Sequence, residues 1–179
     1  MLDHETAIRP AIDTPRLALR PHRPSDAPRI AALANDFEVV KMTGGMPFPY
    51  GLVDAESFIR RAASADLATD VDFAVELPGE GLIGGLGFFT RAELAPEVGY
   101  WLGRPHWGRG YASEMLQGAM AWARREWGQR CVLACHFLDN PASGTVLSRA
   151  GFLYTGRVEP RPCRARGCDV VSRWMAWLA

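Results

Sequence analysis

The residues best suited to chemistry stand in one stretch, residues 97–112, where an apolar run is followed by closely spaced glycines. Gly108 and Gly110 allow the backbone to turn tightly and to approach a ligand without a Cβ atom in the way. Helical periodicity begins at Tyr111, and a helix N-terminus offers unpaired N–H groups and a positive dipole end. The spacing therefore predicts a cradle for a phosphate or pyrophosphate. The alternative is that the glycines form only a tight turn.

Two other phosphate-binding motifs do not fit this stretch. A P-loop needs Lys-Ser or Lys-Thr after the glycines, and neither follows here. The dinucleotide-binding fingerprint needs a third glycine where Ser113 stands, and it opens a βαβ unit instead of following an antiparallel-looking set of strands. A nucleotide-binding module is therefore disfavoured.

The elements that position this stretch follow from the period of the apolar residues. Strands are expected at residues 14–23, 72–77, 81–90, 97–103, 129–138, 152–158 and 168–178. Helices are expected at residues 26–36 with Ser25 as the cap, from a cap at Asp54 onward, at 111–127, and from Asn140 to Gly151. No linker divides this order, which predicts one α/β domain at 14–179 after a tail at 1–13.

Composition excludes several classes of function. Twenty basic residues balance twenty acidic ones, which gives no concentrated positive field for nucleic acid. No apolar run approaches the roughly 20 residues that span a bilayer, and the first ten residues do not resemble a secretory signal. We therefore expect a cytoplasmic protein without membrane contact. In that compartment its four cysteines are expected to be reduced thiols, and their spacing does not match a zinc site.

At this point a resemblance to a known family becomes specific. The motif Trp-Gly-Arg-Gly-Tyr-Ala at 107–112, followed by Glu114, resembles the acetyl-CoA signature of the GNAT superfamily. It is most similar to the ribosomal-protein N-acetyltransferase-like (RimJ/RimL-type) branch. Asn140, Ser143 and the Ala-Gly-Phe at 150–152 resemble that branch's second motif, and residues 14–21 resemble its first strand.

One position departs from the superfamily pattern. Pro105 stands where Gln or Arg is usual, three residues before the first glycine. Arg104 or Arg109 are the candidates to supply that positive charge instead.

The resemblance implies a fold and a coenzyme. The fold would be a mixed, mostly antiparallel sheet of about seven strands, flanked by about four helices and splayed between strands four and five. Acetyl-CoA would be the co-substrate, without a metal, and its pantetheine arm would pair with residues 97–103, where Gly99 is a candidate for a bulge. The coenzyme-binding residues implied in this way are Val98, Tyr100, Trp101, Leu102, Arg104, Trp107, Gly108, Arg109, Gly110, Tyr111, Ala112, Asn140 and Ser143.

The implied reaction moves an acetyl group to the primary amine of a small molecule or a protein N-terminus. Such an amine arrives protonated, so a base is needed, and Glu97 is the candidate because it alternates with Gly99 and Trp101 on one face. The alternative is an exposed strand-end residue. Relatives often use a Tyr to protonate the leaving thiolate, but Leu147 stands there, so Ser143 is the expected proton donor, with Tyr154 in reserve. His106 and His136 are the other titratable candidates, for which a structural role is favoured.

Several alternatives stay open on the sequence alone. The chain could bind acyl-CoA as a sensor without turnover, or use a longer donor such as succinyl-CoA. The aromatic loop at 43–51 either fills the core edge or lines a substrate pocket. The arginine-rich segment at 157–166 is either a solvated turn or a clamp for an acidic group. Homodimers are common in the superfamily, although no residue here indicates one.

Overall fold

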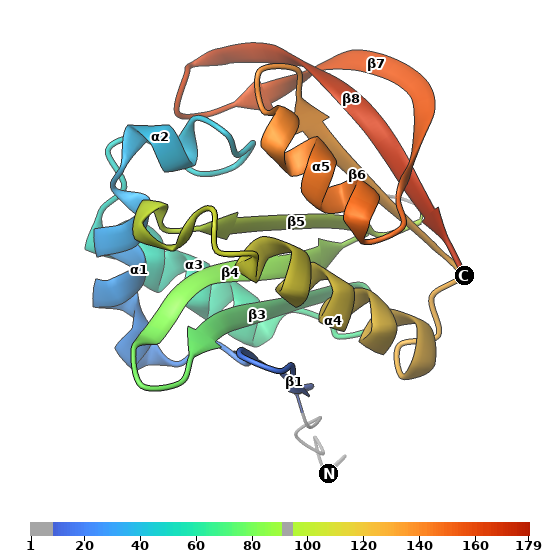
Figure 1. The fold of residues 1–179 in the computed structure, drawn as a ribbon. Coiled ribbons are helices and arrows are strands. Elements are labelled where there is room, and N and C mark those ends of the chain that lie inside the picture. The colour runs from blue at the N-terminus through green and yellow to red at the C-terminus, as the bar shows by residue number, and fades with distance from the viewer. Residues whose placement is uncertain (1–8, 91–94) are drawn as a thin grey trace, which may run out of the picture.

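The computed structural model describes residues 9–90 and 95–179, which form one mixed sheet with helices on both faces (Figure 1). The strands are β1 (Ile12–Asp13), β2 (Ala18–Arg20), β3 (Asp70–Leu77), β4 (Gly81–Phe89), β5 (Glu97–Leu102), β6 (Cys131–Phe137), β7 (Leu153–Cys163) and β8 (Cys168–Leu178). The helices are α1 (Ala27–Ala34), α2 (Phe37–Val40), α3 (Leu52–Ser64), α4 (Tyr111–Arg125) and α5 (Pro141–Arg149). The strand order is β1-β2-β3-β4-β5-β6-β8-β7.

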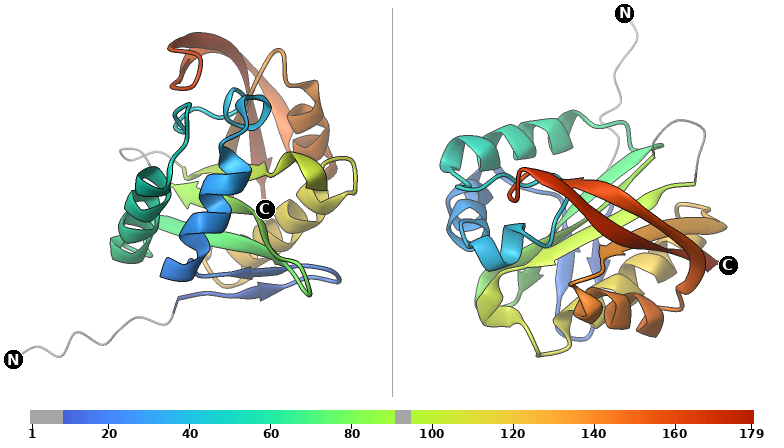
Figure 2. Two further views of the ribbon diagram at one scale, coloured as in Figure 1. Left: turned by 90° about the vertical axis from the view of Figure 1, so that its left-hand side faces the viewer. Right: turned by 90° about the horizontal axis from the view of Figure 1, so that it is seen from above.

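Helices α1 and α3 cover one face of the sheet, and α4 and α5 cover the other (Figure 2). Alternation along the strands divides the core accordingly, because successive side chains point to opposite faces. Phe73, Phe88 and Val98 pack with Met115 and Leu116 of α4 in the larger core. A smaller core of α1, α3, Ala74 and Leu82 lies on the opposite face.

Strands β5 and β6 are parallel and separate almost at once. Their only residue pair within the described chain is Glu97 with Leu133, whereas β4 and β5 pair over six residues. The expected splay between the fourth and fifth long strands is therefore confirmed. The bulge expected at Gly99 is wrong, because the β4–β5 register runs without a shift from Leu102 to Glu97.

The first expected strand, at residues 14–23, is shorter than predicted, because only Ala18–Arg20 (β2) of it is strand. A further strand, β1, lies before it at Ile12–Asp13, inside the expected tail. The Thr14 N–H donates to Leu17 O at 2.8 Å, which closes a turn, so Ile12 pairs back on Leu19. The sheet of the described residues consequently has eight strands instead of about seven. Period-2 patterning could not reveal this turn, since it leaves the alternation of apolar residues intact.

The helix starts also differ from expectation. Ser25 is not a cap, because it lies inside a short 3-10 turn (Pro24–Asp26) and Asp26 occupies the N-cap of α1. Helix α3 begins at Leu52, before Asp54, whose Oδ2 accepts the Gly51 N–H at 2.9 Å. Helix α2 was not expected; it is a single turn capped by Asp36, which accepts the Glu38 N–H.

Strand β7 continues well beyond residue 158, where the sequence suggested its end. Pro160 and Pro162 lack the N–H that a central strand needs, but β7 pairs only with β8 and lies at the sheet edge. Arg157 and Arg161 therefore belong to the strand, and the turn begins after Cys163.

Candidate functional site

The glycine turn before α4 has the geometry of an anion cradle. Gly108 and Gly110 have φ angles of 72° and 81°, in the left-handed region that glycine adopts at least cost. Gly110 is the N-cap of α4, so the unpaired N–H groups of the first helical turn open beside it. Trp107 fixes the approach, because its Nε1 donates to Leu102 O at 2.8 Å.

The N-terminal segment holds this turn in place. Arg16 Nη1 donates to Arg109 O at 3.1 Å, and its guanidinium lies 4.6 Å from the Tyr111 ring centroid. Glu114 accepts from Arg16 Nε at 2.6 Å and from Thr14 Oγ1 at 2.8 Å. Burial alone would raise the pKa of Glu114, but the bonds from Thr14 and Arg16 hold it below its usual range. The carboxylate therefore stays charged and keeps the cradle anchored.

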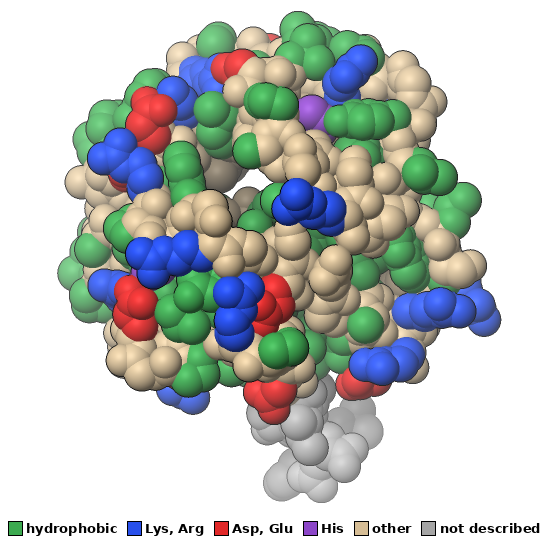
Figure 3. All heavy atoms as spheres, viewed as in Figure 1, with side chains coloured by type: hydrophobic (Ala, Val, Ile, Leu, Met, Phe, Trp, Pro, Cys, Tyr) green, Lys and Arg blue, Asp and Glu red, His purple; other side chains and the backbone are tan. Residues whose placement is uncertain are grey.

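A cavity of about 650 Å³ extends from this cradle between β5 and α5, a size suited to a cofactor. Figure 3 shows the hollow on this face, between α5 and the segment that follows α2. The sequence-predicted residues that line the cavity are Tyr100, Trp101, Leu102, Trp107, Gly108, Gly110, Tyr111, Ala112, Asn140 and Ser143. The structure therefore brings together most of the expected coenzyme set.

Three expected contacts lie elsewhere, and one positive group was missed. Val98 is buried in the core, Arg104 Nε pairs with Asp36 at 3.0 Å, and Arg109 contributes its carbonyl to Arg16. Arg149, at the end of α5, lines the cavity together with Val146. Val146 and Arg149 are three residues apart and therefore lie on the same face of the helix. This spacing is the sequence signal that could have identified Arg149.

Two hydroxyl groups meet inside the cavity. Tyr100 Oη lies 2.9 Å from Ser143 Oγ and donates to Ser143 O at 3.2 Å. Burial raises the pKa of Tyr100 to about 12, so this phenol keeps its proton at neutral pH. Asn140 positions Ser143, because its Oδ1 accepts the Ser143 N–H at 3.2 Å.

Tyr154 is not brought together with these hydroxyls. Its Oη lies 3.0 Å from His136 Nε2, and both residues line a separate cavity of about 530 Å³ with Arg173. His106 lines the coenzyme cavity but is only 2% exposed, and burial lowers its pKa.

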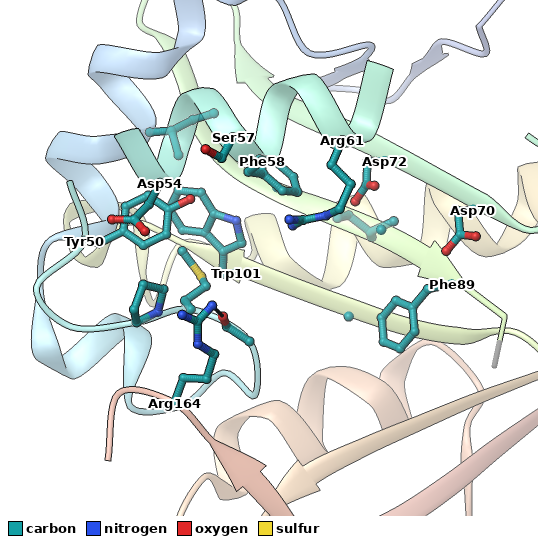
Figure 4. Close-up of a pocket in the computed structure, with 18 of the residues that line it drawn as sticks. Tyr50, Asp54, Ser57, Phe58, Arg61, Asp70, Asp72, Phe89, Trp101 and Arg164 are labelled. Carbon is teal, nitrogen blue, oxygen red and sulfur yellow. Dashed lines mark hydrogen bonds between the residues drawn. The ribbon is translucent and has the colours of Figure 1, made fainter. Parts of the chain in front are cut away.

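A further cavity of about 590 Å³ lies on the other face of β5, under α3 (Figure 4). Its walls carry the aromatic side chains of Tyr50, Phe58 and Trp101, and the carboxylates of Asp54, Asp70 and Asp72. The loop at 43–51 lines it through Gly45, Met46, Pro47 and Tyr50, while Tyr50 also packs in the smaller core. The loop therefore packs at the edge of the core and also lines a cavity.

Glu97 and Arg161 stand between the two large cavities. Arg161 Nη2 lies 3.0 Å from Glu97 Oε1 and 3.1 Å from Oε2, and Glu97 is 8% exposed. Both line a cavity of about 420 Å³, which also contacts Cys135 and Trp101. Cys135 Sγ donates to Glu97 Oε1 at 3.5 Å, and burial raises the pKa of this thiol to about 12. Glu97 is therefore buried and committed to partners, not an exposed strand end.

The other arginines of the β7–β8 hairpin also make internal contacts. Arg166 pairs with Asp139 at 2.6 Å and donates to Lys41 O at 2.8 Å. The Arg164 N–H donates to Gly44 O at 3.1 Å. These bonds fasten the hairpin to the loop that lines the cavity under α3.

Trp101 is common to all three cavities on the β5 strand, those of about 650, 420 and 590 Å³. A coenzyme cleft with a glycine cradle, joined at a splayed strand to a second cavity, defines an acyl-CoA-dependent transferase. Residues 16–153 match the model of the acetyltransferase (GNAT) domain. The chain belongs to this family, and its co-substrate is acetyl-CoA.

Individual relatives agree with this assignment. The chain is 29% identical over 157 residues to the uncharacterized N-acetyltransferase YoaA of Bacillus subtilis, covering 82% of this chain and 85% of that protein. Mycobacterium smegmatis RimJ, solved with CoA-disulfide, has a TM-score of 0.80 at 22% identity over 95% of this chain and 86% of that one. Spermidine N-acetyltransferase of Vibrio cholerae, solved with CoA and spermine, has a TM-score of 0.74 at 20% identity over 91% and 95%.

The described residues contain neither a helix that could span a membrane nor a group of side chains that could hold a metal. Within residues 9–90 and 95–179, no helix has the length and apolarity to cross a membrane. In the same part of the chain, no three His, Cys, Asp or Glu side chains gather as a metal site would require.

Proposed function

We propose that this enzyme transfers the acetyl group of acetyl-CoA directly to the primary amine of a small molecule or a protein N-terminus. The observation that carries the proposal is the position of Trp101, which lines both the coenzyme cavity and the cavity under α3. An amine held on one side of β5 can therefore reach a thioester held on the other side without a covalent enzyme intermediate.

The cradle and the free edge of β5 have separate roles in this proposal. The amides at the start of α4 hold the pyrophosphate, with Arg149 as an additional positive group. Beyond Glu97, β5 pairs with β4 on one edge while β6 diverges from the other. The N–H groups on that open edge are available to the pantetheine arm and to the thioester carbonyl, where a fixed donor stabilises developing negative charge.

The hydroxyl pair supplies the proton for the leaving thiolate. Ser143 and Tyr100 share a hydrogen bond and both line the coenzyme cavity. Because burial raises the pKa of Tyr100 to about 12, the phenol is protonated before the reaction. Ser143 can donate a proton to the sulfur and then be reprotonated by Tyr100. This pair removes the need for a Tyr at position 147.

Relatives support both kinds of acceptor. One neighbour is a spermidine N-acetyltransferase, and another is RimL, a ribosomal L7/L12 alpha-N-protein acetyltransferase. The cavity under α3 is open enough for an amine and its substituent, and it carries carboxylates suited to a cationic acceptor.

The first test is thermal unfolding with excess acetyl-CoA, with succinyl-CoA and ATP as controls. A ligand at 100 times its Kd adds about 2.7 kcal/mol, which shifts the Tm by several degrees. A shift with acetyl-CoA and not with ATP supports the cradle. Release of free CoA thiol on adding primary amines then tests transfer, and a protein that binds acetyl-CoA but never releases thiol with any amine would instead be a sensor.

A further inference from the structure

Asp72 lies across a glycine of the neighbouring strand. In the sheet register, Asp72 of β3 pairs with Gly87 of β4, and Gly87 pairs in turn with Gly99 of β5. A Cβ atom at Gly87 would overlap Asp72 Oδ1, so the absence of a side chain there is what lets the carboxylate lie over β4. Adjacent strands are about 4.8 Å apart. The carboxylate consequently lies about one strand spacing from Gly99, where β5 opens toward the coenzyme.

A second glycine on β4 has the same relationship with Trp101. Gly85 pairs with Trp101, and a Cβ atom at Gly85 would lie 2.9 Å from the indole Nε1. Gly85 and Gly87 thus form a floor without side chains, bordered by the Trp101 indole and the Asp72 carboxylate. Figure 4 shows Asp72 and Trp101 on this floor, with Tyr50 and Phe58 nearby.

The Asp72 carboxylate has no committed partner. No hydrogen bond or ion pair with another residue in the described parts of the chain engages it, unlike Glu97, which is held by Arg161. A carboxylate held by a guanidinium is a poor proton acceptor. A carboxylate that lines a cavity without a partner is free to receive an ammonium group.

The charges around Asp72 are few. Arg61 faces it from α3, Asp70 from its own strand and Arg9 from the N-terminal segment. Strand β4 contributes Gly85, Leu86, Gly87 and Phe89 to the lining of this cavity, none of which titrates. Burial raises the pKa of Asp72 to about 6, with the two arginines acting against that rise. At neutral pH the carboxylate is therefore ionised and more basic than an exposed Asp.

We infer that Asp72, and not Glu97, binds the ammonium group of the acceptor and takes its proton, and that the acceptor is a primary amine with an apolar or aromatic body. The body would lie among Tyr50, Phe58 and Trp101, which line the same cavity. This inference rests on the proposed function, because it assigns the acceptor side of that reaction.

The proton balance is as follows. One N–H proton of the ammonium moves to Asp72, and the nitrogen lone pair forms a bond to the thioester carbon. The C–S bond then breaks as the thiolate takes a proton from Ser143, and Tyr100 reprotonates Ser143. The attacking nitrogen loses its second proton to solvent, and solvent returns one proton to Tyr100. Asp72 finally releases its proton to solvent, so one ammonium ion and one thioester give one amide, one thiol and one proton.

The test uses 2-phenylethylamine at saturating acetyl-CoA, with thiol release as the readout. We expect turnover by the wild type, a loss of at least 100-fold in kcat/KM for Asp72→Asn, and a loss below 10-fold for Glu97→Gln. Asp13→Asn is the matched control, since Asp13 is exposed on β1 and lines none of the described cavities. The acetyl-CoA-dependent Tm shift should be the same in all four proteins.

The pH profile separates a chemical role from a structural one. With Asp72 as proton acceptor, kcat/KM rises to a plateau above about pH 6 and stays level until the amine itself titrates near pH 10. The Asp72→Asn variant can react only with the neutral form of the amine, whose fraction rises with pH. Its kcat/KM should therefore increase about tenfold per pH unit between pH 7 and 9. A wild-type-like rate and plateau in Asp72→Asn would overturn the inference.

The remaining outcomes are also decisive. If the wild type binds acetyl-CoA but does not acetylate 2-phenylethylamine, the acceptor class is wrong while the proposed coenzyme site stands. If the wild type shows no Tm shift with acetyl-CoA, the proposed function itself fails. If Glu97→Gln loses activity more than Asp72→Asn at equal stability, Glu97 is the proton acceptor and the inference is overturned.

Discussion

The hydroxyl of Tyr100 lies 2.9 Å from Ser143 Oγ, which joins the middle of β5 to the first turn of α5. These two elements diverge on either side of the coenzyme cavity. The contacts of Tyr100 Oη with Ser143 Oγ and Ser143 O therefore bridge the two elements at the point where the thioester sulfur is expected, and they couple two hydroxyl groups.

Removing this phenol should impair the chemical step. We expect Tyr100→Phe to lower kcat about 10- to 100-fold, because general acid assistance to a leaving group is worth 10²–10⁴-fold and Ser143 remains. Steady-state kinetics with the best amine would measure this. Ser143→Ala should act similarly, and the double variant should lose little more than either single one. Losses that multiply would show that the two hydroxyls act independently.

The glycine turn should tolerate no side chain. Gly110→Ala places a Cβ on a residue with φ of 81°, at a cost of about 1–2 kcal/mol, and its Cβ would lie 3.4 Å from Arg16 Nη2. We expect a weaker Kd for acetyl-CoA by about 10-fold, measured by calorimetry. Gly79→Ala is the matched control, since Gly79 has φ of 86° in the β3–β4 turn and nothing within 4 Å. Equal effects of both on affinity would mean that the turn only folds the chain.

The fold was predictable where local patterns agree with tertiary packing. The long strands, α4 and the glycine turn follow from period and turn chemistry, and the family motifs placed the coenzyme residues on them. The tight turn at Thr14–Leu17 and the extension of β7 past Pro160 were not predictable, because both depend on which neighbour a strand has. Alternation alone does not show whether a strand lies at an edge.

The sequence predicted most of the proposed coenzyme residues that line the cavity of about 650 Å³, but not the carboxylates that line the cavity under α3. Coenzyme contacts are concentrated in one contiguous stretch, whereas the acceptor cavity gathers residues from α3, β3, β4 and β5. Asp72 was not predicted as a functional residue, because no motif surrounds it in the sequence. Its importance lies in the cross-strand register with Gly87, which only the sheet reveals.

The Glu97–Arg161 pair should contribute mainly to stability. Its side chains are 11% and 19% exposed, so Glu97→Gln leaves Arg161 without its countercharge and should lower the free energy of unfolding by about 2–4 kcal/mol. Urea denaturation would measure this. The double variant Glu97→Gln with Arg161→Met should recover part of the loss, because it removes the uncompensated charge. No recovery would show that Arg161 contributes through other contacts, such as its position 4.8 Å from the Trp174 ring centroid.

Stability should also depend on His22 in mildly acidic solution. Burial lowers the pKa of His22 to about 4, and its ring packs edge-on against Phe58 at 4.9 Å. Between pH 6.5 and 4 the unfolded chain therefore binds more protons at His22 than the folded chain does. The contribution of neutral, buried His22 to the free energy of unfolding is complete above pH 6.5 and is lost as the pH falls to 4. We expect about 3 kcal/mol of loss across that window.

His22→Gln isolates this effect from other titrating groups, including Asp72, whose raised pKa acts in the opposite direction. Urea denaturation of both proteins at several pH values from 4.5 to 7.5 gives the difference. The difference should shrink as the pH falls, and a constant difference would mean that His22 has the same pKa in the folded and unfolded states.

Because Gly85 and Gly87 lack side chains and border only one of the two large cavities, changes there can alter that cavity without affecting the other. In the proposed enzyme the coenzyme depends on backbone amides at α4 and on the open edge of β5, whereas the proposed acceptor cavity is bounded by two glycines of β4. A descendant could exchange one amine for another by altering this floor and the side chains that lie over it, while the donor half of the enzyme is inherited unchanged.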